Sequence, residues 1–360
     1  MTHLRFFSQV VFCCGYTRFL VLDTSNGQMY FFPSIIGKII SDQSYDSSIE
    51  IITESLDNCN RILFQSVIDE LIENELAFVT DTPDRFPKIQ FDNHGNLGFE
   101  NAHIFLSEQT LAYKNELIML LNEMKIKAIK LDFTLLNQQE MMVVLQHLNA
   151  SEVHSIECVI DLKNEEFPVN LIDELCSQNG ALTMISIINH PLISLDHSSE
   201  ILISNALSPY PKIVPNFNLF CESVKNNPYF NGKLYIGSCG EIKMAENTSQ
   251  IYGYLKDRDI GLKIKNSIDF RKFWNISKDS IDICKDCEFR YMCIDNRYPR
   301  QRKDKSLYFV EECRFNPYIS KWSDEVNYID LNETGISVTE SITEINHQVI
   351  SKKNKEVWQS

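Results

Sequence analysis

Four apolar, strand-like runs recur at an almost constant interval through the middle of this chain. They begin at Ala102, Ala128, Ser155 and Leu182, so that successive starts lie 26, 27 and 27 residues apart. Runs this short and rich in β-branched residues are typical of strands. A regular interval of this length leaves room for one helix between each pair of strands, which predicts parallel strands joined by helical crossovers.

The gaps between these runs carry the expected helical patterns. Amphipathic spacing occurs at 117–124 and 141–148, and Pro168 opens a third pattern at 169–175. A fifth strand is expected at 213–220. We therefore predict an α/β fold in which residues 88–220 form a partial (β/α) barrel or an open parallel sheet.

Residues 14–87 follow a different plan. Apolar runs at 19–22 and 29–32 flank the turn-rich stretch 23–27, which predicts a β-hairpin. Three helical patterns and a short strand follow it, at 35–40, 51–56, 63–72 and 77–79. This order predicts a small unit that resembles a winged helix.

A cluster of cysteines near the C-terminal end is the strongest chemical signal. Cys284, Cys287 and Cys293 lie within ten residues, among charged side chains, and Cys313 follows. Two cysteines separated by two residues place both sulfurs on one side of a turn, where they can hold one metal ion or one corner of a cluster. The pattern favours a metal site over buried hydrophobic cysteines or disulfides.

Composition narrows the class of protein. The chain has 360 residues, 44% of them hydrophobic, which is enough for two or three domains with cores. Its 11 cysteines are an odd number and no secretory signal is evident, so we expect a reducing, cytoplasmic environment. No uncharged apolar stretch is long enough to cross a membrane. The net charge of -15 argues against nucleic-acid binding, which requires cations against phosphates.

The C-terminal part is predicted to be poor in regular structure. Residues 221–328 read as a loop-rich domain with one hairpin at 233–242 and the cysteine cluster. Residues 329–360 turn polar, and we expect them to form a mobile or peripheral tail. Isolated cysteines outside the cluster are expected to be core or strand residues, namely Cys13, Cys14, Cys59, Cys158 and Cys176.

The sequence around the cysteines resembles that of a known family. The runs Glu288-Phe-Arg-Tyr-Met-Cys293 and Glu312-Cys313-Arg-Phe-Asn-Pro317 look like the SPASM domain of peptide-modifying radical SAM proteins. More narrowly, they resemble the maturases of grasp-with-spasm systems, which accompany an ATP-grasp ligase in making a ribosomally synthesised, post-translationally modified peptide. The resemblance covers nearly the whole chain.

The resemblance implies one 4Fe-4S cluster held by Cys284, Cys287, Cys293 and Cys313. The four thiols by themselves leave zinc as the alternative. The family's next cysteine, four residues after Cys293, is Arg297 here, and Gly240-Glu-Ile-Lys-Met is followed by Ala245 where another cysteine would stand. The second auxiliary cluster is therefore not expected. Cys221 is a possible relic of it.

The family's catalytic motif is missing from its expected place. Radical SAM enzymes hold their reactive cluster on C-x3-C-x2-C after the first barrel strand, whereas residues 107–114 here read Ser-Glu-Gln-Thr-Leu-Ala-Tyr-Lys. We therefore expect no S-adenosylmethionine and no radical chemistry, and the sequence leaves open whether the chain is an enzyme at all.

The N-terminal unit resembles the recognition element that captures leader peptides of such precursors. Capture would occur by pairing of an extended peptide with a sheet edge. The predicted edge is Met29, Tyr30, Phe31 and Phe32, and the predicted groove wall is Phe64, Val67, Ile68 and Leu71. The alternative is that these apolar residues only fill the core of the unit.

A basic stretch follows the first three cysteines. Arg297, Arg300 and Arg302 stand there with Lys303 and Lys305. Such a run is usually a solvated loop. Because the partner ligase of these systems joins Asp and Glu side chains, the precursor's core is expected to be acidic, and the three arginines are candidates for steering it.

Three functions remain open from the sequence. The leading one is a peptide maturation factor that binds the precursor's leader and presents it to an ATP-grasp ligase, with a structural iron-sulfur cluster. The second is a redox or peptide-modifying iron-sulfur enzyme. The third is a zinc-binding winged-helix regulatory protein, built on the same four thiols.

Overall fold

The protein divides into two compact units that are discontinuous in sequence. The computed structural model describes residues 1–43, 46–87, 89, 98–161, 171–188, 202–204 and 211–359. The first unit contains Met1–Gly95, Tyr210–Pro228 and Ile276–Ser360, and the second contains Asn96–Pro209 and Tyr229–Asn275. The cysteine-rich segment thus folds with the N-terminal module, whereas the sequence suggested consecutive domains.

The N-terminal module is built on a three-stranded antiparallel sheet. Strand β3 (Arg18–Asp23) lies between β2 (Val10–Cys14) and β4 (Gln28–Pro33), so that β4 is an edge strand. The predicted hairpin is confirmed, and Gly27 adopts a φ of 74° in its turn, which glycine tolerates without strain. Strand β2 and strand β1 (His3–Phe6) extend the module before residue 14, and β1 pairs with β5 (Ala77–Thr80).

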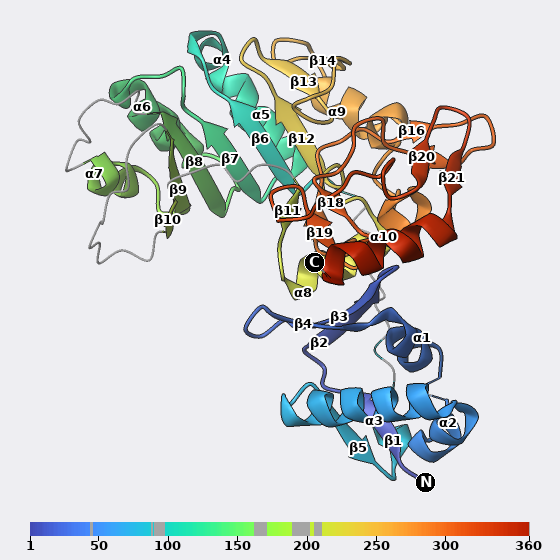
Figure 1. Ribbon diagram of the computed structural model, residues 1–360. Helices are drawn as coiled ribbons and strands as arrows, with labels where there is room; N and C mark the ends of the chain where they lie inside the picture. Colours follow the sequence, from blue (N-terminus) through green and yellow to red (C-terminus); the bar gives the residue numbers. More distant parts are fainter. Residues whose placement is uncertain are drawn as a thin grey trace. The chain divides into compact units, whose positions relative to one another are not determined.

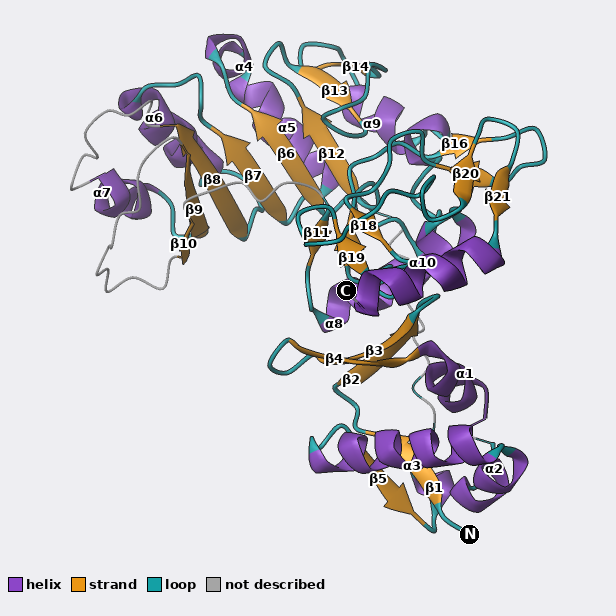
Figure 2. Cartoon of the chain, in the orientation of Figure 1, coloured by secondary structure: helices purple, strands orange, loops and turns teal. Residues whose placement is uncertain are grey.

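Three helices follow, as predicted. They are α1 (Ser34–Gln43), α2 (Ile49–Ser55) and α3 (Asn58–Glu73), and a 3-10 turn η1 (Pro83–Arg85) comes after β5. The side chain of Asp57 accepts a hydrogen bond from Asn60 N at 2.9 Å, which satisfies a backbone donor at the start of α3. Figure 2 shows α3 lying across β1 and β5.

Alternation along β3 sends its side chains into two different cores. Phe19 and Val21 join the core formed with the three helices. Leu20 and Leu22 join a second core with Phe289, which belongs to the cysteine-rich segment. Strand β3 is therefore buried on both faces, one against the helices of the module and the other against a core that includes the cysteine-rich segment.

The cysteine-rich segment has little regular structure, as predicted, and Figure 2 shows it mostly as loop. Its paired strands are each two residues long. They are β11 (Lys212–Ile213) with β15 (Cys293–Ile294), β16 (Arg300–Gln301) with β17 (Leu307–Tyr308), and β18 (Phe315–Asn316) with β19 (Lys321–Trp322). Two 3-10 turns lie among them, η3 (Lys278–Ser280) and η4 (Cys284–Asp286).

The prediction of a fifth strand at 213–220 is wrong. Only β11 is extended there, and helix α8 (Phe217–Lys225) begins directly after Asn216, whose side chain accepts from Leu219 N at 3.1 Å. A short apolar run cannot by its pattern distinguish a strand from a helix, and here the cap decides.

Residues 331–359 are folded, in contrast to the mobile or peripheral tail expected at 329–360. A hairpin of β20 (Ile336–Val338) and β21 (Thr343–Ile345) leads into α10 (His347–Gln359). Ile350 is buried in a core with Tyr318. The helix buries Ile350 and Val357, which lie seven residues apart and therefore on one face, and the polar average composition of the segment conceals this.

In the described part of the second unit, a mixed sheet contains eight strands, and four of them are the parallel strands that the sequence predicted. The order is β10-β9-β8-β7-β6-β12-β13-β14, and the pairs from β10 to β12 are parallel. The strands are β6 (Asn101–Phe105), β7 (Ala128–Asp132), β8 (Ser155–Asp161), β9 (Leu182–Ile188), β10 (Leu202–Ser204), β12 (Lys233–Ile236), β13 (Glu241–Lys243) and β14 (Gly253–Tyr254). The hairpin predicted at 233–242 is β12–β13.

Helices connect these strands, and Figure 1 shows α5 and α6 along one face of the sheet. Strands β6 to β10 advance in one direction, and right-handed crossovers then place their helices on the same face. The helices are α4 (Glu108–Ala112), α5 (Lys114–Met124), α6 (Gln138–Leu148), α7 (Leu171–Gln178) and α9 (Ile260–Lys265), with a 3-10 turn η2 (Asp269–Arg271). The opening of the third helical pattern, at 168–170, lies outside the described residues. Within the described ranges, no helix is long and apolar enough to cross a membrane.

Polar side chains line up across four neighbouring strands of this sheet. The register places Tyr235, His103, Lys130 and Glu157 side by side. Lys130 pairs with Glu157 at 2.8 Å. Burial, together with the charge of Lys130, lowers the pKa of His103 to about 4, so this imidazole is neutral at pH 7.

Candidate metal centre and peptide-binding edge

The four predicted ligand cysteines lie in one short stretch of the first unit. Cys284 opens η4 and Cys287 follows its end, Cys293 begins β15, and Cys313 precedes β18. All four are free thiols; Cys284 and Cys293 are buried, and Cys287 and Cys313 are half-buried. The C-x2-C spacing thus forms a tight turn, as predicted, because a 3-10 turn carries the chain from one cysteine to the next.

The residue before this turn has an unusual backbone conformation. Ile283 has φ 68° and ψ -51°, which is a rare and strained region for a β-branched side chain. Its side chain nevertheless packs against the core around Tyr318 and Ile336. Strain of this kind persists only where the surrounding contacts require it, and it is common next to functional residues.

The thiols are linked to one another electrostatically. Burial raises the pKa of Cys284 to about 12 and that of Cys293 to about 11. After burial come nearby charged groups, namely Asp295 for Cys284 and Cys293 and Glu288 for Cys287, which raise the pKa further. Charge on the other cysteines makes a smaller contribution: Cys313 acts on Cys284 and Cys293, and both of those act on Cys287. Among the described residues, however, no three His, Cys, Asp or Glu side chains are gathered closely enough to hold a metal ion.

Two cations lie beside these thiols. Lys278 is 2% exposed, and its ammonium donates to the carbonyl oxygen of Cys293. Arg297 Nη2 lies 4.0 Å from Cys284 Sγ, and the same guanidinium pairs with Asp295 at 2.6 Å. Lys278 and Arg297 lower the pKa of Cys284 and Cys293, so they oppose the increase that burial causes.

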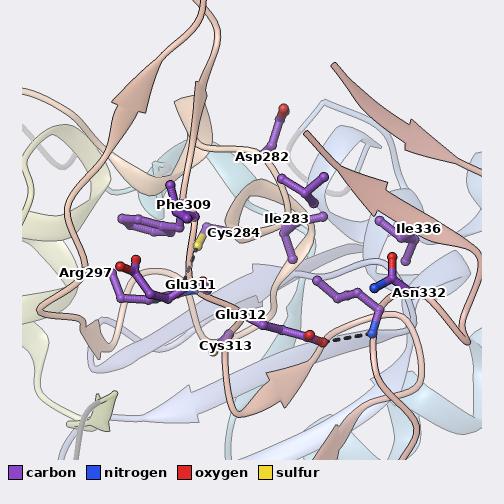
Figure 3. A pocket seen from close by; sticks show the side chains of 13 residues that line it. Asp282, Ile283, Cys284, Arg297, Phe309, Glu311, Glu312, Cys313, Asn332 and Ile336 are labelled. Atoms are coloured by element: carbon purple, nitrogen blue, oxygen red, sulfur yellow. Dashed lines mark hydrogen bonds between the residues drawn. The ribbon is translucent and has the colours of Figure 1, made fainter. Parts of the chain in front are cut away.

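A cavity of about 150 Å³ opens next to Cys284 and Cys313. Figure 3 shows Phe309, Arg297 and Glu311 around the Cys284 side and Glu312 near Cys313. Its remaining wall comes from 331–338, where Leu331 N donates to Glu312 Oε1 at 2.8 Å. The folded C-terminal part therefore contributes to the surroundings of the cysteines.

These residues fit a thiolate-bound metal in donor type and in charge. Four unpaired thiols of a buried segment match the ligands of a 4Fe-4S cluster or of zinc, and both kinds of site require deprotonated sulfur. The two cations would stabilise that negative charge. Among the described residues, these thiols are not gathered to metal-ligand distances.

The other cysteines occupy varied positions. Cys221 lies half-buried in α8, a helix that packs into the core shared with Cys287 and Cys313. Cys13 and Cys14 lie in β2 and Cys158 is buried in β8, as predicted. Cys59 is exposed at the start of α3, so its assignment to the core is wrong. The Cys176 side chain lies outside the described residues.

The predicted leader-binding residues separate into two groups. On the edge strand β4, Phe31 is 42% exposed, Met29 and Tyr30 are half-buried, and Phe32 is buried. On α3, all four predicted wall residues are at most 3% exposed and form part of the helix-side core. They are Phe64, Val67, Ile68 and Leu71. The helix residues therefore take the core position that the sequence left open as the alternative.

The three candidate steering arginines also differ. Arg297 is engaged with Asp295, and Arg302 is 6% exposed and pairs with Asp282 at 2.7 Å. The side chain of Arg300 is exposed on β16, next to the exposed Lys303 and Lys305. Only this exposed part of the basic stretch is in a position to meet a peptide directly.

Sequence reasoning missed the contact that joins the two predicted sites. Arg18, at the start of β3, pairs with Glu288 at 2.8 Å, and the Glu288 side chain is fully buried between Cys287 and Phe289. Burial raises the pKa of Glu288, and the charge of Arg18 opposes the increase. An acidic residue directly after a candidate ligand was the one available signal, and nothing in the sequence identified its partner.

Comparisons with known proteins add no family assignment. No family model matches the sequence, and no curated protein matches it. Two crystal structures of Streptococcus suis SuiB, one bound to S-adenosylmethionine, align with 81% of this chain and 94% of theirs at a TM-score of 0.25. Their sequences are 9% and 10% identical to this one. Similarity at that TM-score supports no conclusion about this chain.

Proposed function

We propose that this chain is a peptide maturation factor. It binds the leader of a ribosomally made precursor along the edge of β4 and presents the precursor to an ATP-grasp ligase. A 4Fe-4S cluster on Cys284, Cys287, Cys293 and Cys313 stabilises the loop-rich segment beneath that edge. The observation that carries the proposal is the packing of the sheet β2–β3–β4 on the cysteine-rich segment.

The metal's role in this proposal is structural. The cysteine-rich segment has only two-residue strands and short turns, so its own backbone hydrogen bonds stabilise it weakly. Metal-binding free energy is available to fold such a segment. Lys278 and Arg297 balance the charge of the deprotonated thiols, and the surrounding apolar residues exclude water.

The edge strand suits a peptide ligand. An extended peptide beside β4 would pair with its free backbone groups and set alternate side chains against Phe31 on one face and Tyr30 on the other. The buried helix residues would support this strand from below without touching the peptide. Arg300, Lys303 and Lys305 are exposed for an acidic core sequence.

Metal content tests the first half of the proposal. Anaerobically purified protein should contain about four irons and as much acid-labile sulfide per chain, and Cys293→Ala should lose both. Cys59→Ala, which changes an exposed free cysteine, is the matched control and should retain them. About one zinc without sulfide would favour the zinc-binding alternative, and no metal in the wild-type chain would refute the centre altogether.

Peptide binding tests the second half. We would select binders from a displayed library of short random peptides on the metal-loaded chain and measure their affinities by fluorescence anisotropy. Phe31→Ala should weaken binding about tenfold or more, because it removes the exposed aromatic contact of the edge. Ile62→Ala changes an exposed apolar residue of α3 and is the control. An equal loss of affinity in both variants, or an affinity that does not change in Phe31→Ala, would contradict the proposed site.

A further inference from the structure

Residues 286–290 contact the turn between β2 and β3 through several consecutive positions. Tyr16 N donates to the carbonyl oxygen of Asp286 at 2.7 Å. Arg290 Nη1 donates to the carbonyl oxygens of Cys14 and Cys287, at 2.8 and 3.0 Å. The stretch that carries one candidate metal ligand is thus hydrogen-bonded along its length to the peptide-binding module.

Glu288 lies at the centre of this contact. Its Oε1 accepts a hydrogen bond from Arg18 Nε at 2.8 Å and forms an ion pair with Arg18 Nη2 at 2.8 Å. On the other side, a Cβ added to Gly15 would lie 2.7 Å from Glu288 N and 2.9 Å from its Oε2. Glycine is therefore the residue that lets the two backbones approach, and the contact has no room to slide.

The same arginine continues the contact to the edge strand. The Arg18 guanidinium lies 4.3 Å from the centre of the Phe31 ring. That ring packs edge-on against Phe289 at 5.9 Å between centres. A short path of direct contacts therefore runs from Cys287 through Glu288 and Arg18 to the exposed side chain of β4.

We propose that metal loading of the four cysteines and the order of the β4 edge are coupled through Glu288 and Arg18. This inference rests on the proposed function and adds a rule to it: the chain presents a competent peptide-binding edge only when its metal site is filled. Metal fixes the turn that carries Cys287, and the turn then holds Glu288 against Arg18 and Gly15. Because coupling between two sites is reciprocal, a peptide bound at β4 raises metal affinity by the same factor.

Hydrogen exchange followed by mass spectrometry tests the coupling without a known precursor. The chain would be compared after removal of metal by a chelator and after anaerobic reconstitution with iron and sulfide. We expect amides of 18–33 to exchange about tenfold more slowly in the loaded chain, within the usual range of coupling between sites. Amides of β6 to β8, in the second unit, should not change.

Two variants locate the coupling and one controls for arginine loss. Arg18→Met and Glu288→Gln should keep their metal but lose most of the protection that metal gives to 28–33. Glu288→Gln retains the shape of the side chain, so it tests the charge contact even if Arg18→Met folds poorly. Arg61→Met is the control, since Arg61 binds backbone oxygens of Thr53 and Leu56 in the same module, and it should behave as the wild type.

The outcomes separate the two proposals. Metal bound with unchanged exchange of 18–33, or equal protection in Arg18→Met and Glu288→Gln, would overturn the coupling and leave the metal centre standing. A wild-type chain that takes up no metal would overturn both. Protection that depends on metal and on the Arg18–Glu288 pair would establish the coupling.

Discussion

Lys278 gives the sharpest test of the proposed charge balance at the metal centre. Its ammonium is buried and donates to the carbonyl oxygen of Cys293, and the charges of Cys293, of the buried Asp295 and of Cys284 raise its pKa against the effect of burial. Burying a cation costs several kcal/mol, so its presence here requires a compensating negative charge. Deprotonated, metal-bound thiols would supply that charge. We therefore expect Lys278→Met to act in opposite directions on the metal-free and metal-loaded chains.

The magnitudes follow from two opposing effects. In the metal-free chain, methionine removes the desolvation cost of the cation but loses one hydrogen bond of about 1 to 3 kcal/mol, so stability should stay the same or rise by up to about 2 kcal/mol. In the loaded chain, losing one unit charge costs about 2 kcal/mol if an illustrative separation of about 7 Å and an effective dielectric constant of about 20 are assumed. That free-energy difference corresponds to a metal dissociation constant about 30-fold higher in the variant.

The assay compares both states with a matched control. Urea denaturation of the metal-free protein measures stability, and competition with a chelator measures metal retention. Lys285→Met is the control, because Lys285 lies between Cys284 and Cys287 but is 45% exposed and pairs with Asp282 at 2.9 Å. Solvent screens that charge, so its loss should matter little. A Lys278→Met protein that holds metal as tightly as the wild type would refute the charge-balance argument.

Three further predictions test the fold around the site. The pKa of His103 is lowered to about 4 in the folded chain, so the unfolded chain binds a proton at this residue at higher pH, and stability should fall as the pH drops from about 6.5 to 4. In urea denaturation at pH 4.5, His103→Gln should lose about 2 to 3 kcal/mol less stability than the wild type does relative to pH 7. An identical pH profile of stability in both proteins would contradict this. Gly37→Ala should destabilise the N-terminal module by about 1 to 3 kcal/mol although alanine favours helices, since an added Cβ would overlap the buried ring of Phe19; a stability gain in thermal unfolding would show that α1 can move away. Ile350→Ala should cost about 2 to 5 kcal/mol and speed proteolysis of the C-terminal helix, whereas a mobile tail would register no change.

Local sequence determined most of the elements and the identity of the candidate ligands. The spacing of the runs at Ala102, Ala128 and Ser155 predicted parallel strands, because side-chain periodicity and chain length are properties of contiguous residues. The turn between Cys284 and Cys287 was likewise predicted from a spacing of three. Where the same local information was ambiguous, as at 213–220, the prediction was wrong, since only the cap at Asn216 separated helix from strand.

The tertiary structure decided which of these elements meet. Glu288 and Arg18 are 270 residues apart, and no local pattern records their ion pair. Folding also turned the predicted groove wall on α3 into core, buried Arg302 in an ion pair, and gave the polar C-terminal segment an apolar face against Tyr318. Each of these outcomes depends on which distant segment packs against a side chain and excludes water from it. Such contacts form only when the chain folds, so a local sequence pattern does not contain them.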